Sequence, residues 1–499
     1  MTTQGLFLSS FVAVPVLMLL AFLPCRNIKQ VRTVAVVGAA IEMILALVLL
    51  FWFFALRNAG DTSEMLFYDS VNWFQAANMS INYTIGVDGI SVLMLLLTAV
   101  IIMTGTFASW NMNPLPKDFF MWLTLLSIGV YGFFISVDMF TMFFFYEIAL
   151  IPMYLLIGLW GTGRKEYSAM KLTLMLMGGS AFLLVGIFGI YYNSPIIDGH
   201  HTFNILEIAA NNTIPFSAQK WIFPLTFLGF GVLGALFPFH TWSPDGHASA
   251  PTAVSMLHAG VLMKLGGYGC FRIAMRLLPE AADELSWIFI ILTGISVLYG
   301  ALGAISQTDL KYINAYSSVS HCGLVLFAIL MMNKTAMTGA VMQMLSHGLM
   351  TALFFALIGM IYGRTHTRDI RQMGGLMKIM PFLCVCYVIA GMASLGLPGL
   401  SGFVAEMTIF VGSFQHPDMF HRVFTIIAIS SIVVTAVYIL KVVGKILYGP
   451  VLDKHHLELT DAVWYEKIAV VMLIICVAGV GLFPGWISNL IHSSLAYIH

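Results

Sequence analysis

Three ionisable side chains stand inside long apolar stretches of the 499-residue sequence. Glu147 lies in FFFYEIALIPMYLL, Lys264 in HAGVLMKLGGYG and Glu406 in GLSGFVAEMTIF. A charged group at the centre of a membrane helix costs roughly 2.5–3.5 kcal/mol, so its presence indicates function by default. Lys264 is too deep in its stretch to reach either surface easily, and Glu147 and Glu406 could alternatively be permanently neutral acids. We predict that all three gain and lose protons.

Histidines form a second set of candidate groups. His321 and His347 lie in consecutive apolar stretches at similar depth, and His240 and His247 flank a bend after residues 222–242. A single buried histidine is usually a satisfied core group. Neutral imidazole both donates and accepts hydrogen bonds, however, so a row of histidines with water can relay protons. We therefore predict that these four are relay members.

The composition requires a membrane protein. Hydrophobic residues make up 60% of the chain and charged residues only 9%, against about 25% charged residues in a soluble protein. Lys+Arg and Asp+Glu are both 23. Because the sequence has no basic cluster, it predicts no nucleic-acid-binding surface. No CxxC, zinc-type Cys/His spacing, GxGxxG or P-loop occurs. We expect no cofactor or metal in this chain, and other membrane proteins as its partners.

Apolar runs of about 20 residues, the length of a membrane helix, recur along the whole chain. Because the runs are continuous rather than alternating, they predict an all-α polytopic membrane protein and exclude a barrel. Glu42, in the second run, could equally be peripheral and is assigned no role. The 14 predicted spans are 5–25, 34–56, 89–110, 119–137, 139–160, 167–192, 222–242, 250–275, 286–306, 312–332, 336–362, 379–413, 422–448 and 468–492.

The loops predict the orientation. With the first loop placed inside, the inner loops and helix ends collect 16 Lys and Arg residues, Lys311 among them, against six outside, including Arg272. An excess of cations marks the inner side, so both termini are predicted to lie outside. The longest outer connections, 57–88 and 193–220, are too short for a soluble domain. Any chemistry is therefore expected inside the bundle.

Two of the spans should be broken. The seventh contains Pro224 and Pro238, and the twelfth contains LPGLSG at 397–402. Proline removes a backbone donor, and such breaks survive at membrane depth only where they line a polar interior. The breaks lie five spans apart, which predicts two inverted five-helix repeats, the pattern of ion-translocating transporters. The predicted units are 1–118 (spans 1–3), 119–275 (first repeat), 286–448 (second repeat) and 449–499 (last span).

Longer motifs carry a specific resemblance over nearly the whole chain. They are GVDGISVLML (86–95), FFFYEIALIPMYLL (143–156), PFHTWSPDGHASAPTAVSMLHAGVLMKLGGYG (238–269), QTDLKYINAYSSVSHCGLV (307–325), MLSHGLMTALFFALIGMIYGRTHTRDI (344–370) and GLPGLSGFVAEM (396–407). The sequence resembles the antiporter-like subunits of respiratory complex I, most closely the M-type or chain 4. The resemblance implies 14 core helices in inverted repeats. It also implies that Glu147, Lys264 and Glu406 are the key titratable groups, with His321 and His347 between them.

The resemblance also implies a function and a setting. Quinone reduction in other subunits would drive protons outward through this chain, whose neighbours would be the L-type and N-type subunits. NADH, flavin, iron–sulfur clusters and quinone would be bound elsewhere in an assembly in the bacterial plasma membrane or the mitochondrial inner membrane. A glutamate at 406 and the lack of a long C-terminal extension favour the M-type. The alternatives are the D-type subunit of a multisubunit cation/proton antiporter and a purely structural spacer.

One position departs from the family pattern. The family normally has a lysine in the seventh span that pairs with the glutamate of the fifth, and Leu233 stands in its place here. Glu147 has therefore lost its expected partner. His258, about 9 Å along the helix from Lys264, and Lys171, with its long stem, are candidate replacements. The third possibility is that Glu147 stays neutral and silent.

Overall fold

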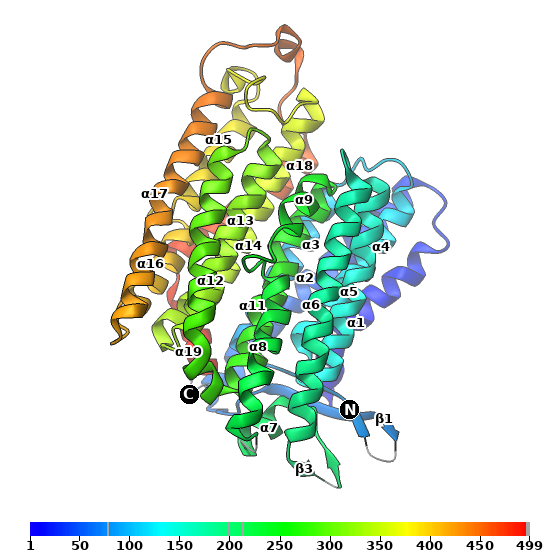
Figure 1. Ribbon diagram of the computed structural model, residues 1–499. Helices are drawn as coiled ribbons and strands as arrows, with labels where there is room; N and C mark the ends of the chain where they lie inside the picture. The colour runs from blue at the N-terminus through cyan, green and yellow to red at the C-terminus, as the bar shows by residue number, and fades with distance from the viewer. Residues whose placement is uncertain (77–78, 198, 212–213, 496–499) are drawn as a thin grey trace.

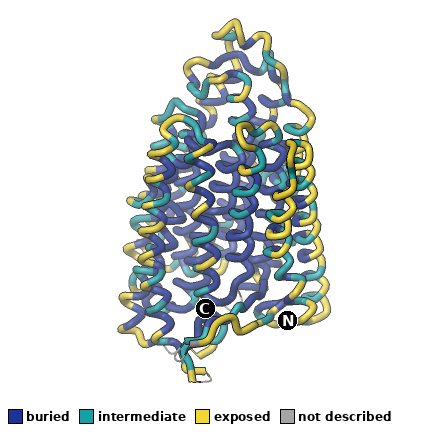
Figure 2. The backbone as a smooth tube through the Cα atoms, turned by 90° about the vertical axis from the view of Figure 1, so that its right-hand side faces the viewer, coloured by how far each residue is buried: buried dark blue, intermediate teal, exposed yellow. Residues whose placement is uncertain are grey.

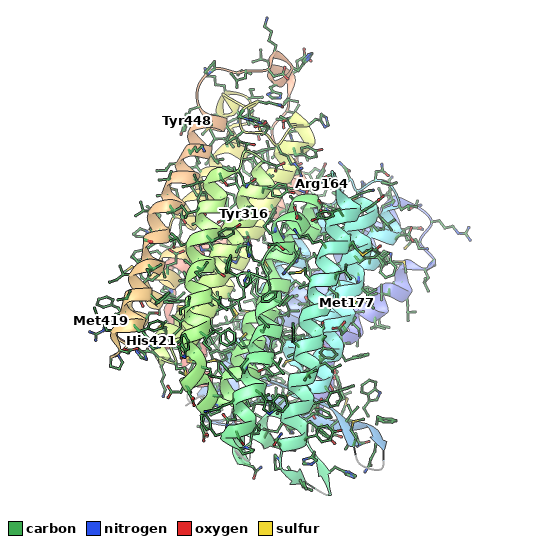
Figure 3. All side chains as sticks on the ribbon, in the orientation of Figure 1. Arg164, Met177, Tyr316, Met419, His421 and Tyr448 are labelled. Carbon is green, nitrogen blue, oxygen red and sulfur yellow. The ribbon has the colours of Figure 1, made fainter. Side chains whose placement is uncertain are left out.

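The computed structural model describes residues 1–499 except 77–78, 198, 212–213 and 496–499. Its helices run side by side through one tall bundle (Figure 1). The N- and C-terminal ends of the described chain lie at the same end of the bundle, which we call the terminal end. Arg164 and Tyr448 lie toward the opposite end, whereas Met419 and His421 lie toward the terminal end (Figure 3).

The predicted all-α polytopic membrane fold is confirmed. Eleven helices of the described chain are long and apolar enough to cross a membrane. They are α1 (Thr3–Phe22), α2 (Ile28–Asn58), α3 (Gly89–Ala108), α4 (Pro116–Ile135), α5 (Met139–Trp160), α6 (Lys165–Asn193), α12 (Pro279–Ser306), α13 (Leu310–Leu330), α14 (Lys334–Thr365), α17 (Met419–Leu447) and α18 (Trp464–Leu482).

The remaining three predicted spans are interrupted helices. Pro224 is accommodated within its helix, contrary to the prediction, and the break falls at Pro238. The order of three continuous helices, one broken helix and a fifth helix occurs twice, from α4 and from α12. The interrupted spans consist of α8 (Phe216–Leu233) with α9 (Trp242–Ser249); α10 (Thr252–Leu257), the π-helical turn η1 (His258–Leu262), α11 (Met263–Gly269) and the π-helical turn η2 (Cys270–Met275); and α15 (Pro381–Ser394) with α16 (Ser401–Phe414).

Short strands and short helices lie at the ends of the bundle. The connection at 57–88, treated as a loop above, contains the antiparallel hairpin of β1 (Leu66–Ala76) and β2 (Met79–Val87). The span predicted at 468–492 is too long, because α18 ends before Pro484 and α19 (Gly485–Leu495) follows. The other small elements are β3 (Ile196–Ile197), β4 (His200–His201), α7 (Ile205–Asn211), η3 (Leu376–Lys378) and η4 (Lys454–Glu458).

Burial separates central from peripheral helices. Helices α3, α13 and α14 are almost completely covered by other helices, whereas only 28% of the most apolar stretch of α1 and of α18 is buried. Exposed residues lie along the flanks of the bundle (Figure 2). Large apolar residues such as Leu17, Phe51 and Ile475 are among the exposed residues. An apolar exterior is what lipid tails require, so the polar groups of interest lie around α13 and α14.

The break between α8 and α9 keeps its backbone groups paired. The Trp242 indole donates to the carbonyl of Val232 at 3.0 Å. The amide of Phe237 donates to the hydroxyl of Ser296 at 2.7 Å. Because an unpaired backbone group is costly in a membrane, these side chains make the break tolerable.

The helix that carries Lys264 approaches α14 through two glycines. A Cβ at Gly348 would lie 2.6 Å from the carbonyl oxygen of Gly260, closer than real Cβ contacts allow. Only glycine lets the two backbones approach this closely. This contact sets the spacing between η1 and the segment of α14 that contains His347.

We predict that Gly348→Ala forces α14 away from η1 and destabilises the folded protein by about 1–3 kcal/mol, the usual range for overpacking. Gly363→Ala on the same helix is the matched control, since a Cβ there meets no atom within 4 Å. Unfolding of the purified protein in detergent measures both variants. Equal stability of the two variants would contradict the close contact.

Candidate functional site

Lys264 lies at the centre of the bundle, and both of its hydrogen-bond acceptors belong to residues inside the bundle. Its Nζ donates to the carbonyl of Ala259 at 2.5 Å and lies 2.7 Å from Nδ1 of His347. Among the described residues, no carboxylate lies within ion-pair distance of this amine. The imidazole nitrogen is the acceptor when the amine donates, so the contact can pass a proton from one base to the other.

The π-helical turn η1 supplies one of these acceptors. In this turn the amide of Met263 bonds to the carbonyl of His258, five residues back, rather than following the α-helical pattern. The neighbouring carbonyl of Ala259 accepts from the Lys264 side chain. Single π-helical turns often occur at functional sites. The irregular backbone therefore solvates the amine in a region that has no bulk water.

Two further groups continue the contact into the second repeat. The rings of His347 and His321 have centroids 5.2 Å apart. His321 Nδ1 lies 3.3 Å from a carboxylate oxygen of Glu406. The four side chains Lys264, His347, His321 and Glu406 thus form one line, which we call the central chain. It connects α11, α14, α13 and α16.

His321 Nδ1 has two competing partners. Besides Glu406, the side-chain amide nitrogen of Gln343 lies 3.0 Å from the same ring nitrogen. A protonated Nδ1 can donate to the Glu406 carboxylate, whereas a bare Nδ1 can accept from the Gln343 amide. The site therefore offers a hydrogen-bond partner for each protonation state of His321.

Glu406 follows the second broken helix. A Cβ added at Gly396, in the break, would lie 3.2 Å from a Glu406 carboxylate oxygen. Gly396 also has φ +67°, a conformation that favours glycine. The hydroxyl of Ser346 donates to that of Ser401, the first residue of α16, at 2.8 Å. The break thus makes room for the carboxylate and ties α16 to α14.

A histidine pair lies on the other side of Lys264. The rings of His247 and His258 have centroids 4.2 Å apart, and His258 stacks on Trp242. His247 Nε2 lies 3.4 Å from the sulfur of Met263, the residue before Lys264. His247, one of the predicted relay members, thus lies against the residue that precedes Lys264. His240 packs instead against Tyr299, with ring centroids 4.9 Å apart, and does not join the chain.

Charged groups surround the start of α10 at the end opposite the termini. Lys311 is buried, and its Nζ donates to the carbonyl of Ala250 at 2.6 Å. The sequence analysis counted Lys311 among the cations of the inner loops and helix ends, and it does lie in the first turn of α13, but its burial was not foreseen. It precedes the span predicted at 312–332 by one residue, yet a cation in the first turn of a helix opposes the helix dipole and signals another partner. Lys171 pairs with Asp245 at 2.7 Å beside it.

Comparisons with known proteins identify the family. The family model for the NADH:quinone oxidoreductase/Mrp antiporter transmembrane region matches residues 136–435. The chain belongs to this family. NAD(P)H-quinone oxidoreductase chain 4 3 of Picosynechococcus is 36% identical over 90% of this chain and 80% of its own length. NADH-quinone oxidoreductase subunit M of Rickettsia bellii is 33% identical over 94% of this chain and 92% of its own.

Solved structures share the fold. A chain of respiratory complex I from Thermus thermophilus superposes with a TM-score of 0.86 at 24% identity, covering 99% of this chain and 100% of its own. A chain of the Mrp complex from Dietzia superposes with a TM-score of 0.85 at 20% identity, covering 100% and 98%. At these identities the likeness supports the fold of this family member and not its activity.

In this member of the family, Glu147 has no cationic partner among the described residues. Lys171 is engaged by Asp245, and His258 stacks on Trp242, so neither candidate replacement contacts it. Ser180 of α6 is the polar group beside it, while a Cβ at the preceding Gly179 would meet Val232 of α8. Helix α6 thus stands between Glu147 and the end of α8 that carries Leu233.

The sequence analysis missed a buried ion pair toward the terminal end. Arg272, counted above as an outer cation, is buried and pairs with Asp88, the N-cap of α3. The hydroxyl of Ser91 donates to Asp88 at 3.0 Å and lies 2.8 Å from that of Tyr268. The signal was present, since Asp88 lies in the motif GVDGIS and a buried arginine needs a carboxylate. The pair anchors η2 to α3.

The described residues contain no group of three His, Cys, Asp or Glu side chains that could hold a metal ion. A cavity of about 10 Å³ does lie beside Lys264, bounded by Cys322, Met344 and Gly267. That volume matches roughly one water molecule. The chemistry that this arrangement supports is proton transfer among an amine, imidazoles and a carboxyl.

We predict that His347→Leu destabilises the protein by about 1–3 kcal/mol, because Lys264 loses a buried hydrogen-bond acceptor. In a Lys264→Met background the same change should cost much less, and a double-mutant cycle measured by unfolding in detergent gives the difference. His240→Leu with Lys264→Met is the control cycle and should be additive. Additivity in the first cycle would contradict the bond.

Proposed function

We propose that this chain is the M-type proton-translocating membrane subunit of an NADH-quinone oxidoreductase. The observation that carries the proposal is the central chain, in which Lys264, His347, His321 and Glu406 follow one another through the middle of the bundle. The identity of 33–36% to chain 4 and subunit M relatives over nine-tenths of the chain or more supports the same assignment. Quinone reduction takes place in other subunits and drives the protons.

Each group in the central chain can hand on a proton without leaving its place. Protonated Lys264 gives a proton to His347 Nδ1, and the imidazole releases a different proton from Nε2. The ring separation of 5.2 Å requires one bridging water or a ring rotation before His321 receives it. His321 Nδ1 then protonates Glu406, which lies 3.3 Å away. Imidazole suits both steps because its two nitrogens exchange donor and acceptor roles.

Protons enter, in this proposal, at the end opposite the termini. The charged groups around Ala250 lie there, and the excess of Lys and Arg in the loops of that end marks the inner side of the membrane. Both termini then face outward. Lys311 lies next to the broken α9–α10 connection, and the His247–His258 pair continues from it toward Lys264. Glu406 lies at the exit side of the central chain.

The assembly follows from the same assignment. The chain occupies a membrane arm beside the L-type and N-type subunits, in a bacterial plasma membrane or mitochondrial inner membrane. It binds no NADH, flavin, iron–sulfur cluster or quinone itself, because the sequence offers no motif for them. One observation favours a second candidate, the D-type subunit of a cation/proton antiporter. This is the matching family model, whose description names the Mrp antiporter beside NADH:quinone oxidoreductase. Purification of the native complex distinguishes the two candidates, because redox subunits accompany the chain only if it is the M-type subunit.

We predict that Lys264→Ala lowers proton translocation to less than about a tenth of wild type while the complex still assembles, because the change removes both a titrating group and a costly buried charge. A pH-sensitive dye in vesicles with the reconstituted complex measures translocation. Lys334→Ala, at an exposed lysine, is the control. Wild-type translocation by Lys264→Ala would show that the central chain does not carry the protons. The chain would then be a purely structural spacer.

Glu406→Gln should impair proton release to a similar degree, since an amide of the same shape cannot take up or release a proton. Quinone reduction and translocation are measured together, so that a loss of coupling is visible. Glu284→Gln is the control, because Glu284 is exposed and paired with Lys220. Unchanged coupling in Glu406→Gln would make Glu406 a packing residue.

Glu147→Gln should retain more than about half of wild-type translocation. The reason is that Glu147, which is half-buried, has no cation among the described residues with which to exchange a charge, and an unpaired carboxyl away from water favours its neutral form. The same vesicle assay applies, with Lys264→Ala as the inactive reference. A loss as severe as that of Lys264→Ala would show that another group reaches Glu147 during turnover.

A further inference from the structure

A buried carboxyl without a hydrogen-bond partner lies outside the central chain. Glu42 of α2 is 1% exposed, and neither of its carboxyl oxygens has a hydrogen-bond partner. It borders a cavity of about 10 Å³ where α1, α2, α3 and α4 meet. That volume holds roughly one water molecule. The sequence analysis gave this residue no role because its apolar surroundings could equally have been the edge of the bundle.

The cavity offers hydrogen-bond acceptors and no donors. Three hydroxyls border it, and each gives its only hydrogen to the backbone of its own helix: Thr106 to Ile102 at 2.8 Å, Thr124 to Phe120 at 2.8 Å, and Ser127 to Thr124 at 2.7 Å. A hydroxyl that has donated its hydrogen presents only lone pairs. Whatever fills the cavity must therefore supply the hydrogens or a positive charge.

The surroundings provide no such charge. The most closely packed neighbours, α1 and α3, contain no titratable side chain. Helix α4 carries Lys117 and Asp118 in its first turn and Tyr131, whose buried hydroxyl also lacks a partner. On α2 itself, Arg32 is bonded to the carbonyl of Trp110 at the bundle end. Among the described residues none forms an ion pair with Glu42.

We propose that Glu42 and this cavity form a lateral proton-binding site that holds one proton on the carboxyl and one water molecule. The carboxyl hydrogen and the two water hydrogens give three donors, which match the three hydroxyl acceptors. An ionised, unpaired carboxylate would be far more costly in the same place. The site lies outside the central chain and goes beyond the proposed function.

The position of the cavity indicates the side from which it is loaded. Thr106 lies two residues before the end of α3, and Phe120 lies four residues after the start of α4, about 6 Å along the helix. Both helix ends are at the end opposite the termini. On its other side, α3 turns apolar residues such as Leu97 and Ile101 toward Gly348 and Gly260. Glu42 itself lies 14 residues after the start of α2, about 21 Å along the helix, so the bordering hydroxyl of Thr106 lies between it and that end. The site therefore exchanges protons with that end of the bundle and not with Lys264.

Infrared difference spectroscopy on the full assembled complex tests the proposal. The wild-type minus Glu42→Gln spectrum at neutral pH should contain one carbonyl band of a protonated carboxylic acid, which shifts to lower frequency in heavy water. Absence of the band would overturn the proposal. If Glu42→Gln fails to assemble, Glu42→Asp keeps an acid and should give a paired positive and negative band, whose absence overturns the proposal equally.

The rival occupant is a monovalent cation held by an ionised Glu42. The same spectra are recorded in sodium-free and sodium-rich buffers at constant pH, and the band should not change. Loss of the band on addition of sodium would overturn the proton site in favour of a cation site. Thr124→Val keeps the shape of the cavity but removes one acceptor, so the band should shift. An unshifted band would overturn the hydrogen-bonded water.

Discussion

Lys264 is a basic side chain in the middle of a membrane bundle, and every hydrogen-bond acceptor that it uses has to come from the protein itself. One comes from the π-helical turn beside it, and the other is an imidazole of α14. The carbonyl belongs to the same segment as Lys264, whereas the imidazole would be out of reach if the two helices were separated by a normal side-chain layer. The glycine contact between η1 and α14 therefore serves the amine as much as the packing. The π-helical turn and the close contact between η1 and α14 each supply a hydrogen-bond acceptor for the buried amine.

The broken helices extend this principle. At the first break, Trp242 and Ser296 pair with released backbone groups. At the second, Ser346 donates to the hydroxyl of Ser401 at the start of α16, and the break admits a carboxyl near Gly396. A buried lysine is held in turn at the α9–α10 connection, near Ala250. The polar interior is thus a consequence of interrupted secondary structure at equivalent places in the two repeats.

Much of this was predictable because a membrane makes polar residues conspicuous. Lys264, His321, His347 and Glu406 stand out against apolar neighbours, and the structure brings all four into one line. Lys311 and Arg272 were counted only as an inner and an outer cation, and their burial was missed because residues at span ends look like loop residues when depth is judged from sequence alone. The π-helical turns and the β1–β2 hairpin depend on tertiary contacts, which helical periodicity does not report. Gln343 could have been found, since it lies four residues before His347 on one helix face.

Helix α3 has a consequence that its packing alone does not suggest. It crosses the bundle without a single titratable side chain and turns glycine and aliphatic residues toward the repeats. The apolar side chains of α3 therefore separate the protons of the Glu42 cavity from those of the central chain. A chain that moves charge across a membrane loses energy when protons return by a second route, and a carboxyl in a cavity beside the main route would provide one. The apolar sequence of α3 blocks that route.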